Sequence, residues 1–183
     1  KSSLSMINAE AVVSGDADVI RAADRIILPG VGAFGDARRK LADSGLDSVL
    51  MSEAAKGKPL MGICLGMQLM CEYSEEGNTD CLGIFPTPVK RFQPICKDEK
   101  VPHMGWNTLT HSGQGLFRDM AQNEFVYFVH SYYVPVNEYT AAQTDYILPF
   151  SASLNKDNFY ATQFHPEKSG KTGEQILVNF LNL

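Results

Sequence analysis

The sequence lacks several features that would point to particular classes of protein. No apolar stretch approaches the roughly 20 residues of a membrane-spanning helix, and the first residues lack the apolar core of a secretory signal peptide. None of the four cysteines belongs to a C-x-x-C pair, which disfavours a zinc site or a disulfide framework. Basic residues are fewer than acidic ones, 16 against 21, and the resulting net charge of −5 disfavours nucleic-acid binding. We therefore expect a cytoplasmic protein with reduced thiols, and no metal, cofactor, nucleic acid or membrane among its ligands and partners.

The composition is typical of a folded domain. The chain has 183 residues, of which 44% are hydrophobic and 20% are charged, and this predicts one domain over residues 1–183. Apolar runs at residues 25–28 and 59–63 predict buried strands, and residues 36–56 and 65–73 predict helices, the first interrupted near Gly45. This alternation is typical of a βαβ unit with parallel strands and a right-handed crossover.

The second half of the chain and its first twenty residues differ from this alternating pattern. Short strands are predicted at residues 89–92, 107–109, 125–134, 142–147 and 159–164, with a helix at 172–181. The first twenty residues predict the end of a helix at 4–7 and a weak strand at 11–13, although a doubly wound domain normally opens with a strand. The predicted fold class is α/β, with a mixed, mostly parallel sheet flanked by helices.

The sharpest motif is G-I-C-L-G at residues 62–66, between a predicted strand and a predicted helix. Glycines on both sides permit a tight turn that exposes the Cys64 side chain, and the helix that follows favours the thiolate and offers backbone N–H groups to an oxyanion. The pattern predicts a cysteine nucleophile; the alternative is a buried cysteine at a strand end.

A second motif, H-P-E at residues 165–167, can supply the partners of such a nucleophile. Pro166 favours an extended backbone at His165, which places His165 and Glu167 on one side of the chain. An imidazole can then move a proton for Cys64 while a carboxylate orients it, and the rate should depend on a group titrating near neutrality. The alternative is a solvated turn.

A third segment, L-P-G-V-G at residues 28–32, is a glycine-rich loop that can present N–H groups to an anion, although by itself it is more often a simple turn. Together the three segments resemble the class I, triad-type glutamine amidotransferases, with a flavodoxin-like core. Within that class, P-H-M-G-W-N at 102–107, Y-F-V-H-S-Y at 127–132 and T-Q-F-H-P-E-K-S at 162–169 resemble the glutaminase subunit of imidazole glycerol phosphate synthase.

The resemblance implies a reaction and roles for individual residues. Glutamine would be hydrolysed to glutamate and ammonia by a Cys64, His165 and Glu167 triad, with the Leu65 N–H and the Pro29–Gly32 loop supplying oxyanion donors. The implied substrate-binding residues are Gly30, Gly32, Leu65, Gln68, Ser131 and Tyr132. Residues implied near a subunit interface are His103, Trp106, Tyr127 and Lys168. For Trp106 a place in the core, and for Lys168 a solvated surface, are the alternatives.

The resemblance also implies a partner, a (β/α)₈-barrel cyclase subunit in a heterodimer, which receives ammonia through a channel and makes imidazole glycerol phosphate in histidine biosynthesis. Family members usually start with a strand and a D-Y-G-x-G-N loop, which this sequence does not show. Loss of an inner strand would expose sheet edges, so we expect that this sequence omits an N-terminal segment of roughly 10–20 residues. Alternatives are a paralogue that feeds a sugar-amination system, another class I amidotransferase, a non-catalytic module, and a cysteine protease or γ-glutamyl hydrolase.

Overall fold

A six-stranded mixed sheet forms the centre of the computed structural model, which describes residues 4, 9–30 and 32–183. Its strands lie in the order β1 (Ile26–Leu28), β2 (Leu60–Ile63), β12 (Phe159–Thr162), β11 (Leu148–Lys156), β10 (Thr140–Tyr146) and β7 (Thr110–His111). The pairs β1–β2 and β2–β12 are parallel, and the other three pairs are antiparallel. The predicted mixed α/β sheet is confirmed, but parallel pairing is confined to one half, because β10, β11 and β12 follow one another through short hairpin turns.

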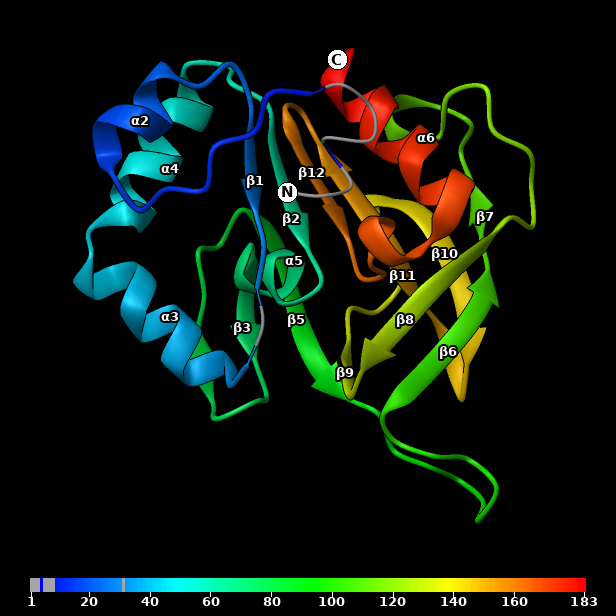
Figure 1. The fold of residues 1–183 in the computed structure, drawn as a ribbon. Helices are drawn as coiled ribbons and strands as arrows, with labels where there is room; N and C mark the ends of the chain where they lie inside the picture. The colour runs from blue at the N-terminus through cyan, green and yellow to red at the C-terminus, as the bar shows by residue number, and fades with distance from the viewer. Residues whose placement is uncertain (1–3, 5–8, 31) are drawn as a thin grey trace.

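Helices and two smaller sheets surround this sheet (Figure 1). The helices are α2 (Ala17–Ala22), α3 (Phe34–Asp43), α4 (Leu46–Ala55), α5 (Leu65–Leu69) and α6 (Gly170–Leu181), with 3₁₀ turns η1 (Gly115–Phe117) and η2 (Pro166–Lys168). One small sheet holds β4 (Thr79–Asp80), β3 (Cys71–Ser74), β5 (Phe85–Arg91) and β9 (Tyr132–Tyr133). The other is a two-stranded ribbon of β6 (His103–Thr108) and β8 (Phe125–His130).

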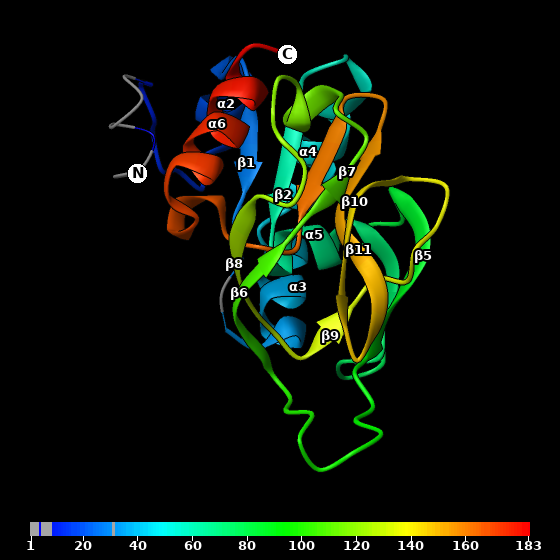
Figure 2. The ribbon, with the colours of Figure 1, turned by 90° about the vertical axis from the view of Figure 1, so that its right-hand side faces the viewer.

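Successive side chains of β2 belong to two apolar clusters, one on each face of the sheet. Leu60 packs in the cluster that contains Leu50 of α4. Met61 packs in the cluster that contains Phe180 of α6. Since successive strand residues point to opposite faces, α4 and α6 cover opposite sides. Figure 2 shows α6 to the left of the central strands.

The structure confirms some of the predicted helices and strands and differs from others. The break near Gly45 is confirmed, because Gly45 adopts φ 69° between α3 and α4. The helix predicted to reach residue 73 ends at Leu69, and residues 71–74 form β3. The strand predicted at 11–13 is wrong, since Val12 and Val13 are 70% and 83% exposed and no described strand pairs with them. Of the predicted helix end at 4–7, residues 5–7 lie outside the described part.

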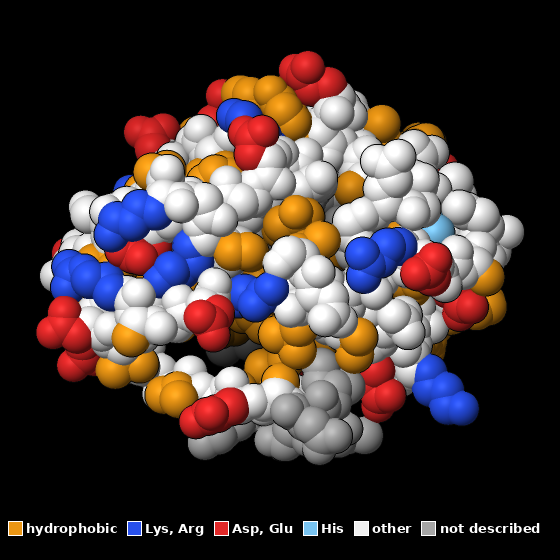
Figure 3. All heavy atoms as spheres, turned by 90° about the horizontal axis from the view of Figure 1, so that it is seen from above, with side chains coloured by type: hydrophobic (Ala, Val, Ile, Leu, Met, Phe, Trp, Pro, Cys, Tyr) orange, Lys and Arg blue, Asp and Glu red, His pale blue; other side chains and the backbone are white. Residues whose placement is uncertain are grey.

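Charge is mixed on the end of the molecule seen in Figure 3, where basic and acidic side chains lie among one another over the side of α2 and α4. Within the described residues, no helix combines the length and the apolar character needed to span a membrane.

Candidate active site

Cys64 occupies a strained turn between β2 and α5. Its backbone has φ 54° and ψ −109°, a conformation that costs free energy for any residue with a Cβ atom. The Cys64 N–H donates to the Thr162 carbonyl of the neighbouring strand at 2.7 Å, which fixes the turn. A Cβ atom at Gly66 would collide with the Leu28 carbonyl, so glycine is required where α5 crosses the end of β1. The flanking glycines therefore allow the sharp turn that exposes Cys64, as the motif predicts.

His165 reaches Cys64 from the segment after β12. Its backbone is extended, with φ −101° and ψ 98°, and its N–H donates to the Tyr127 carbonyl of β8 at 3.0 Å. The Nδ1 atom of His165 lies 2.7 Å from Oε1 of Glu167, and the Cys64 side chain is close enough to raise the pKa of the imidazole. The sulfur, the imidazole and the carboxylate thus lie in series, an arrangement that can carry out nucleophilic attack with proton transfer.

The two partners of His165 control its protonation. Burial by itself lowers the pKa of His165, but the hydrogen bonds with Cys64 and Glu167 outweigh burial and raise that pKa to about 9. Burial raises the pKa of Glu167, whereas its hydrogen bond with His165 dominates and leaves that pKa below its usual value. The group expected to titrate near neutrality is therefore held as an imidazolium at neutral pH, ready to donate a proton.

A pocket of about 390 Å³ opens beside the sulfur. Its lining residues are Gly30, Gly32, Cys64, Leu65, Gln68, Glu76, Pro102, Val129, His130, Ser131, Tyr132, His165 and Lys168. All six residues proposed from the resemblance to bind substrate are among them. A Cβ atom on Gly30 would lie 2.7 Å from Cβ of Leu65, so only glycine lets this loop approach α5 so closely. Gly32 adopts φ +93°, and residue 31 between the two glycines lies outside the described part.

Among the residues at the site that escaped the sequence prediction are Glu76 and Gln163. Glu76 is the acidic side chain that lines the pocket. Gln163 is fully buried, and its Nε2 atom lies 3.8 Å from Sγ of Cys64. The extended chain that places His165 and Glu167 together also places Gln163 two residues before His165, so the same alternation could have identified it. Glu76 lies within the turn at residues 75–78, where no comparable signal exists.

The residues expected near an interface separate into two groups. Trp106 is 56% exposed and meets Tyr127 with ring centroids 5.9 Å apart, and Nζ of Lys168 lies 5.9 Å from the Tyr127 ring centre. The alternative of Trp106 as core is thereby excluded. His103 does not lie on the surface as an interface residue would. The residue is only 4% exposed, and its ring stacks on Tyr146 at 4.1 Å between centroids. Since successive strand residues face opposite ways, the side chain of His103 points into the core and offers a partner no surface.

The remaining thiols and candidate metal ligands play no part in this arrangement. Cys71 is buried and Cys81 half-buried, whereas Cys96 is exposed and does not fill apolar space as the other two do. Within the described residues, no group of three or more His, Cys, Asp and Glu side chains is placed to hold a metal ion.

Comparison with known proteins identifies the family. The model of the family "Glutamine amidotransferase class-I" matches residues 5–183. The chain is 59% identical over 180 residues to imidazole glycerol phosphate synthase subunit HisH of Bacteroides fragilis, covering 98% of this chain and 90% of that protein. It is 47% identical to the HisH subunit of Neisseria meningitidis serogroup B, with 96% and 86% covered, and 44% identical to that of Methanothermobacter thermautotrophicus, with 97% and 88% covered.

Solved structures agree at the level of the fold. A crystal structure of a glutamine amidotransferase superimposes with a TM-score of 0.77 at 16% identity, over 100% of this chain and 90% of that one. A putative GMP synthase protein from Thermoplasma acidophilum gives a TM-score of 0.71 at 18% identity, over 99% and 84%. The chain belongs to the class-I glutamine amidotransferases and, within them, to the family of imidazole glycerol phosphate synthase HisH subunits.

Proposed function

We propose that the chain is the glutaminase subunit of an imidazole glycerol phosphate synthase, a single amidotransferase domain that hydrolyses glutamine and passes the ammonia to a cyclase subunit. The observation that carries the proposal is the Cys64, His165 and Glu167 series beside a pocket, in a chain 59% identical to a HisH subunit. In this role the pair of subunits makes imidazole glycerol phosphate and aminoimidazole carboxamide ribotide for histidine biosynthesis.

The chemistry uses the charge state of His165. The Cys64 thiolate attacks the side-chain carbonyl of glutamine, and the carbonyl π electrons move onto oxygen. The tetrahedral intermediate collapses as the C–N bond breaks, and the His165 imidazolium gives its proton to the departing nitrogen, so that ammonia and a thioester remain. The neutral imidazole then takes a proton from water, which attacks the thioester and releases glutamate and the thiolate. Glu167 holds the ring through Nδ1 at 2.7 Å throughout.

The pocket has the charges that free glutamine needs. The α-ammonium group of glutamine would pair with the Glu76 carboxylate, and its α-carboxylate would be attracted by the Lys168 ammonium. Leu65 is the first residue of α5, so its N–H has no partner within the helix and can serve the oxyanion. Gly30 packs against Leu65 and carries the second proposed donor loop, whose N–H groups would act after a peptide rotation.

A docking surface for the cyclase lies on the outer side of the β6–β8 ribbon. We define this ribbon face by Met104, Trp106, Phe125 and Tyr127, of which the first three are 63%, 56% and 58% exposed. Exposed aromatic and Met side chains gathered on one face are typical of protein interfaces. Lys168 lines the pocket and also reaches the Tyr127 ring, so the pocket and the ribbon face are continuous. Ammonia released beside Cys64 therefore needs only a short path to a barrel seated on this face.

The test is glutamate release from glutamine, measured with and without a barrel cyclase loaded with its ribonucleotide. We expect strong stimulation by the loaded cyclase, and loss of turnover in Cys64→Ala. Trp106→Ala should weaken cyclase binding by about tenfold or more, whereas Met51→Ala, an exposed apolar residue of α4 on the other side of the molecule (Figure 1), should not. Turnover only with a sugar-aminating partner would reassign the chain to that pathway, and no turnover with any partner would overturn the proposal.

A further inference from the structure

The buried carboxamide of Gln163 contacts the nucleophile directly. Its side chain is 0% exposed, and Nε2 lies 3.8 Å from the Cys64 sulfur. We propose that Gln163 is a positioning residue for the Cys64 thiolate, donating from its NH₂ group to the sulfur and holding the charged nucleophile in place. The proposal rests on the proposed glutaminase function and adds to it a residue that stabilises the thiolate without exchanging a proton.

The orientation of the Gln163 amide follows from its neighbours. The end of Gln68 that faces the Tyr132 carbonyl, 3.2 Å away, must be the NH₂ group, because a backbone carbonyl only accepts hydrogen bonds. That same nitrogen lies 3.0 Å from the Gln163 side chain, so Gln163 must present its oxygen there. Its NH₂ group is then left facing Cys64. The donor at the sulfur is fixed by this chain of hydrogen bonds, and a flipped amide would break it.

The backbone holds Gln163 in register with His165. The Gln163 N–H donates to the Ala152 carbonyl of β11 at 2.8 Å, directly after the end of β12. Two residues further on, His165 lines the same pocket as Cys64, and the Cys64 side chain raises the pKa of the imidazole. The sulfur therefore has a neutral donor and a charged donor from one extended segment. His165 gives up its proton in each cycle, whereas the amide keeps its hydrogens and can support the thiolate whenever it forms.

A third neighbour shows why a fixed donor is needed. The Val129 carbonyl oxygen lies 3.9 Å from the Cys64 sulfur and can accept a hydrogen bond from the neutral thiol. An acceptor in this position favours the thiol and repels the thiolate. The Gln163 NH₂ group offsets that repulsion, since a donor favours the charged form. Removing the donor while Val129 stays in place should therefore shift Cys64 towards the thiol.

The experiment measures thiolate formation directly, in the full chain without a partner. Iodoacetamide alkylation of Cys64 is followed from pH 5 to 10 by mass analysis of the Cys64 peptide, which separates it from the exposed Cys96. Gln163→Met removes both ends of the amide. Gln163→Glu keeps the shape and the acceptor for Gln68 but replaces the donor with a carboxylate oxygen. Gln122→Met is the control, because Gln122 hydrogen-bonds to the His111 backbone on another part of the molecule.

We expect the alkylation midpoint to rise by about one pH unit in Gln163→Met, as befits loss of one hydrogen bond to a charged group. It should rise by more in Gln163→Glu, where a carboxylate also repels the thiolate. One pH unit corresponds to about tenfold less thiolate below the midpoint. With a loaded cyclase, glutaminase kcat should fall about tenfold while KM for glutamine changes less than about twofold. Gln122→Met should match the wild type in both assays.

Two outcomes would overturn the proposal. One is a midpoint in Gln163→Glu equal to that of the wild type, which would mean that Gln163 only fills space and accepts from Gln68. The other is a midpoint in Gln163→Met equal to that of the wild type. If Gln163→Met does not fold, as judged by thermal unfolding, the Glu variant decides alone. A shifted midpoint in a chain that hydrolyses no glutamine with any partner would refute the glutaminase function and leave the positioning role standing.

Discussion

His103 and His130 lie 3.0 Å apart, Nδ1 to Nε2, and the hydrogen bond between them runs in one direction. Nδ1 of His130 lies 2.7 Å from the Tyr132 carbonyl, which only accepts, so this nitrogen carries the proton. Nε2 of the neutral His130 ring must then accept from Nδ1 of His103. A single backbone carbonyl thus sets the tautomer of both rings, and the same carbonyl accepts from Gln68 in the active site.

The first prediction is a loss of stability in mild acid, which follows because both histidines are neutral in the folded chain. Burial lowers the pKa of His103 to about 4 and that of His130 to about 3, against 6.5 in an unfolded chain. Between pH 6.5 and about 4 the unfolded chain binds more protons than the folded one, so the free energy of unfolding falls as the pH falls. The slope should reach about 1.4 kcal/mol per pH unit for each histidine. Urea unfolding between pH 4 and 8 measures it.

A variant separates the pair from other acid-sensitive groups. In His103→Asn the amide can still donate to His130, but one titrating group is gone, so the slope between pH 6.5 and 4 should decrease. At pH 8 the variant should lose about 1–3 kcal/mol, because the His103 ring stacks on Tyr146 and on Phe128. An unchanged slope would show that the buried pair is not the source of the acid sensitivity.

His165 makes the second prediction, with the opposite sign. Its pKa is raised from 6.5 to about 9, so the folded chain binds more protons between these values. Its contribution to stability is complete below pH 6.5 and is lost as the pH rises through 9. In Glu167→Gln the His165 midpoint, followed by NMR of the ring, should fall below the wild-type value, and kcat should drop by an order of 10² or more as the ring loses its orienting carboxylate. An unchanged midpoint would exclude Glu167 as a support of the imidazolium.

The parts of the site that the sequence predicts are those governed by neighbouring residues. Glycines on both sides of Cys64 and a proline after His165 restrict the backbone locally, so the turn and the alignment with Glu167 follow from the sequence alone. The contact of Gln163 with the sulfur and the burial of His103 depend on packing between segments. The mixed sheet is predicted, but its antiparallel share is larger than expected, because local patterns do not encode strand direction.

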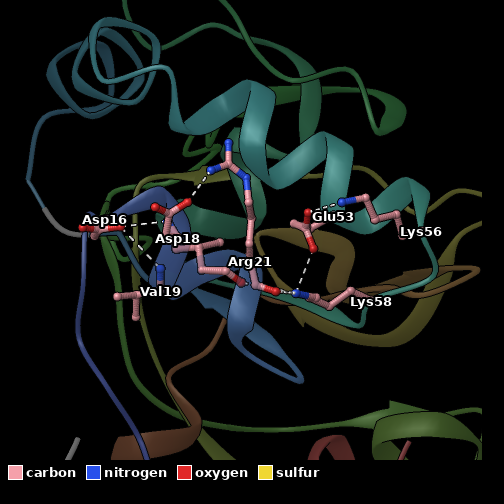
Figure 4. Close-up of polar contacts among 8 residues, drawn as sticks. Asp16, Asp18, Val19, Arg21, Glu53, Lys56 and Lys58 are labelled. Carbon is pink, nitrogen blue, oxygen red and sulfur yellow. Dashed lines mark hydrogen bonds and ion pairs between the residues drawn. The ribbon is translucent and has the colours of Figure 1, made fainter.

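The third prediction concerns the buried carboxylate of Glu53, which joins α4 to α2 (Figure 4). Its oxygens lie 2.6 Å from Nζ of Lys56 and 2.9 Å from Nζ of Lys58, and Lys58 also donates to the Arg21 carbonyl at 2.7 Å, at the end of α2. Hydrogen bonds with the two lysines lower the pKa of Glu53 to about 2. Its contribution to stability is therefore present above pH 4.5 and lost as the pH falls through 2.

Glu53→Gln should lower the melting temperature at pH 7, and the difference from the wild type should shrink below pH 4.5. Asp18→Asn is the control, because the Asp18–Arg21 pair is exposed and should change the free energy of unfolding by less than about 0.5 kcal/mol. Thermal unfolding at pH 3, 5 and 7 compares the three proteins. A loss in Glu53→Gln that is the same at all three pH values would mean that the carboxylate charge is not what stabilises the α2–α4 contact.

The fourth prediction tests the close packing beneath Cys64. In Gly66→Ala the added methyl group would meet the Leu28 carbonyl, so α5 must move away from β1 at a cost of about 1–3 kcal/mol. In Gly35→Ala, within α3, the methyl group meets nothing within 4 Å. That change should stabilise the chain by about 0.5–1 kcal/mol through helix propensity. Urea unfolding compares them, and glutamate release should fall in Gly66→Ala only, because moving α5 shifts the Leu65 N–H away from the position of the oxyanion. Equal stability of the two variants would show that α5 can move freely, and the strained backbone of Cys64 would then need another cause.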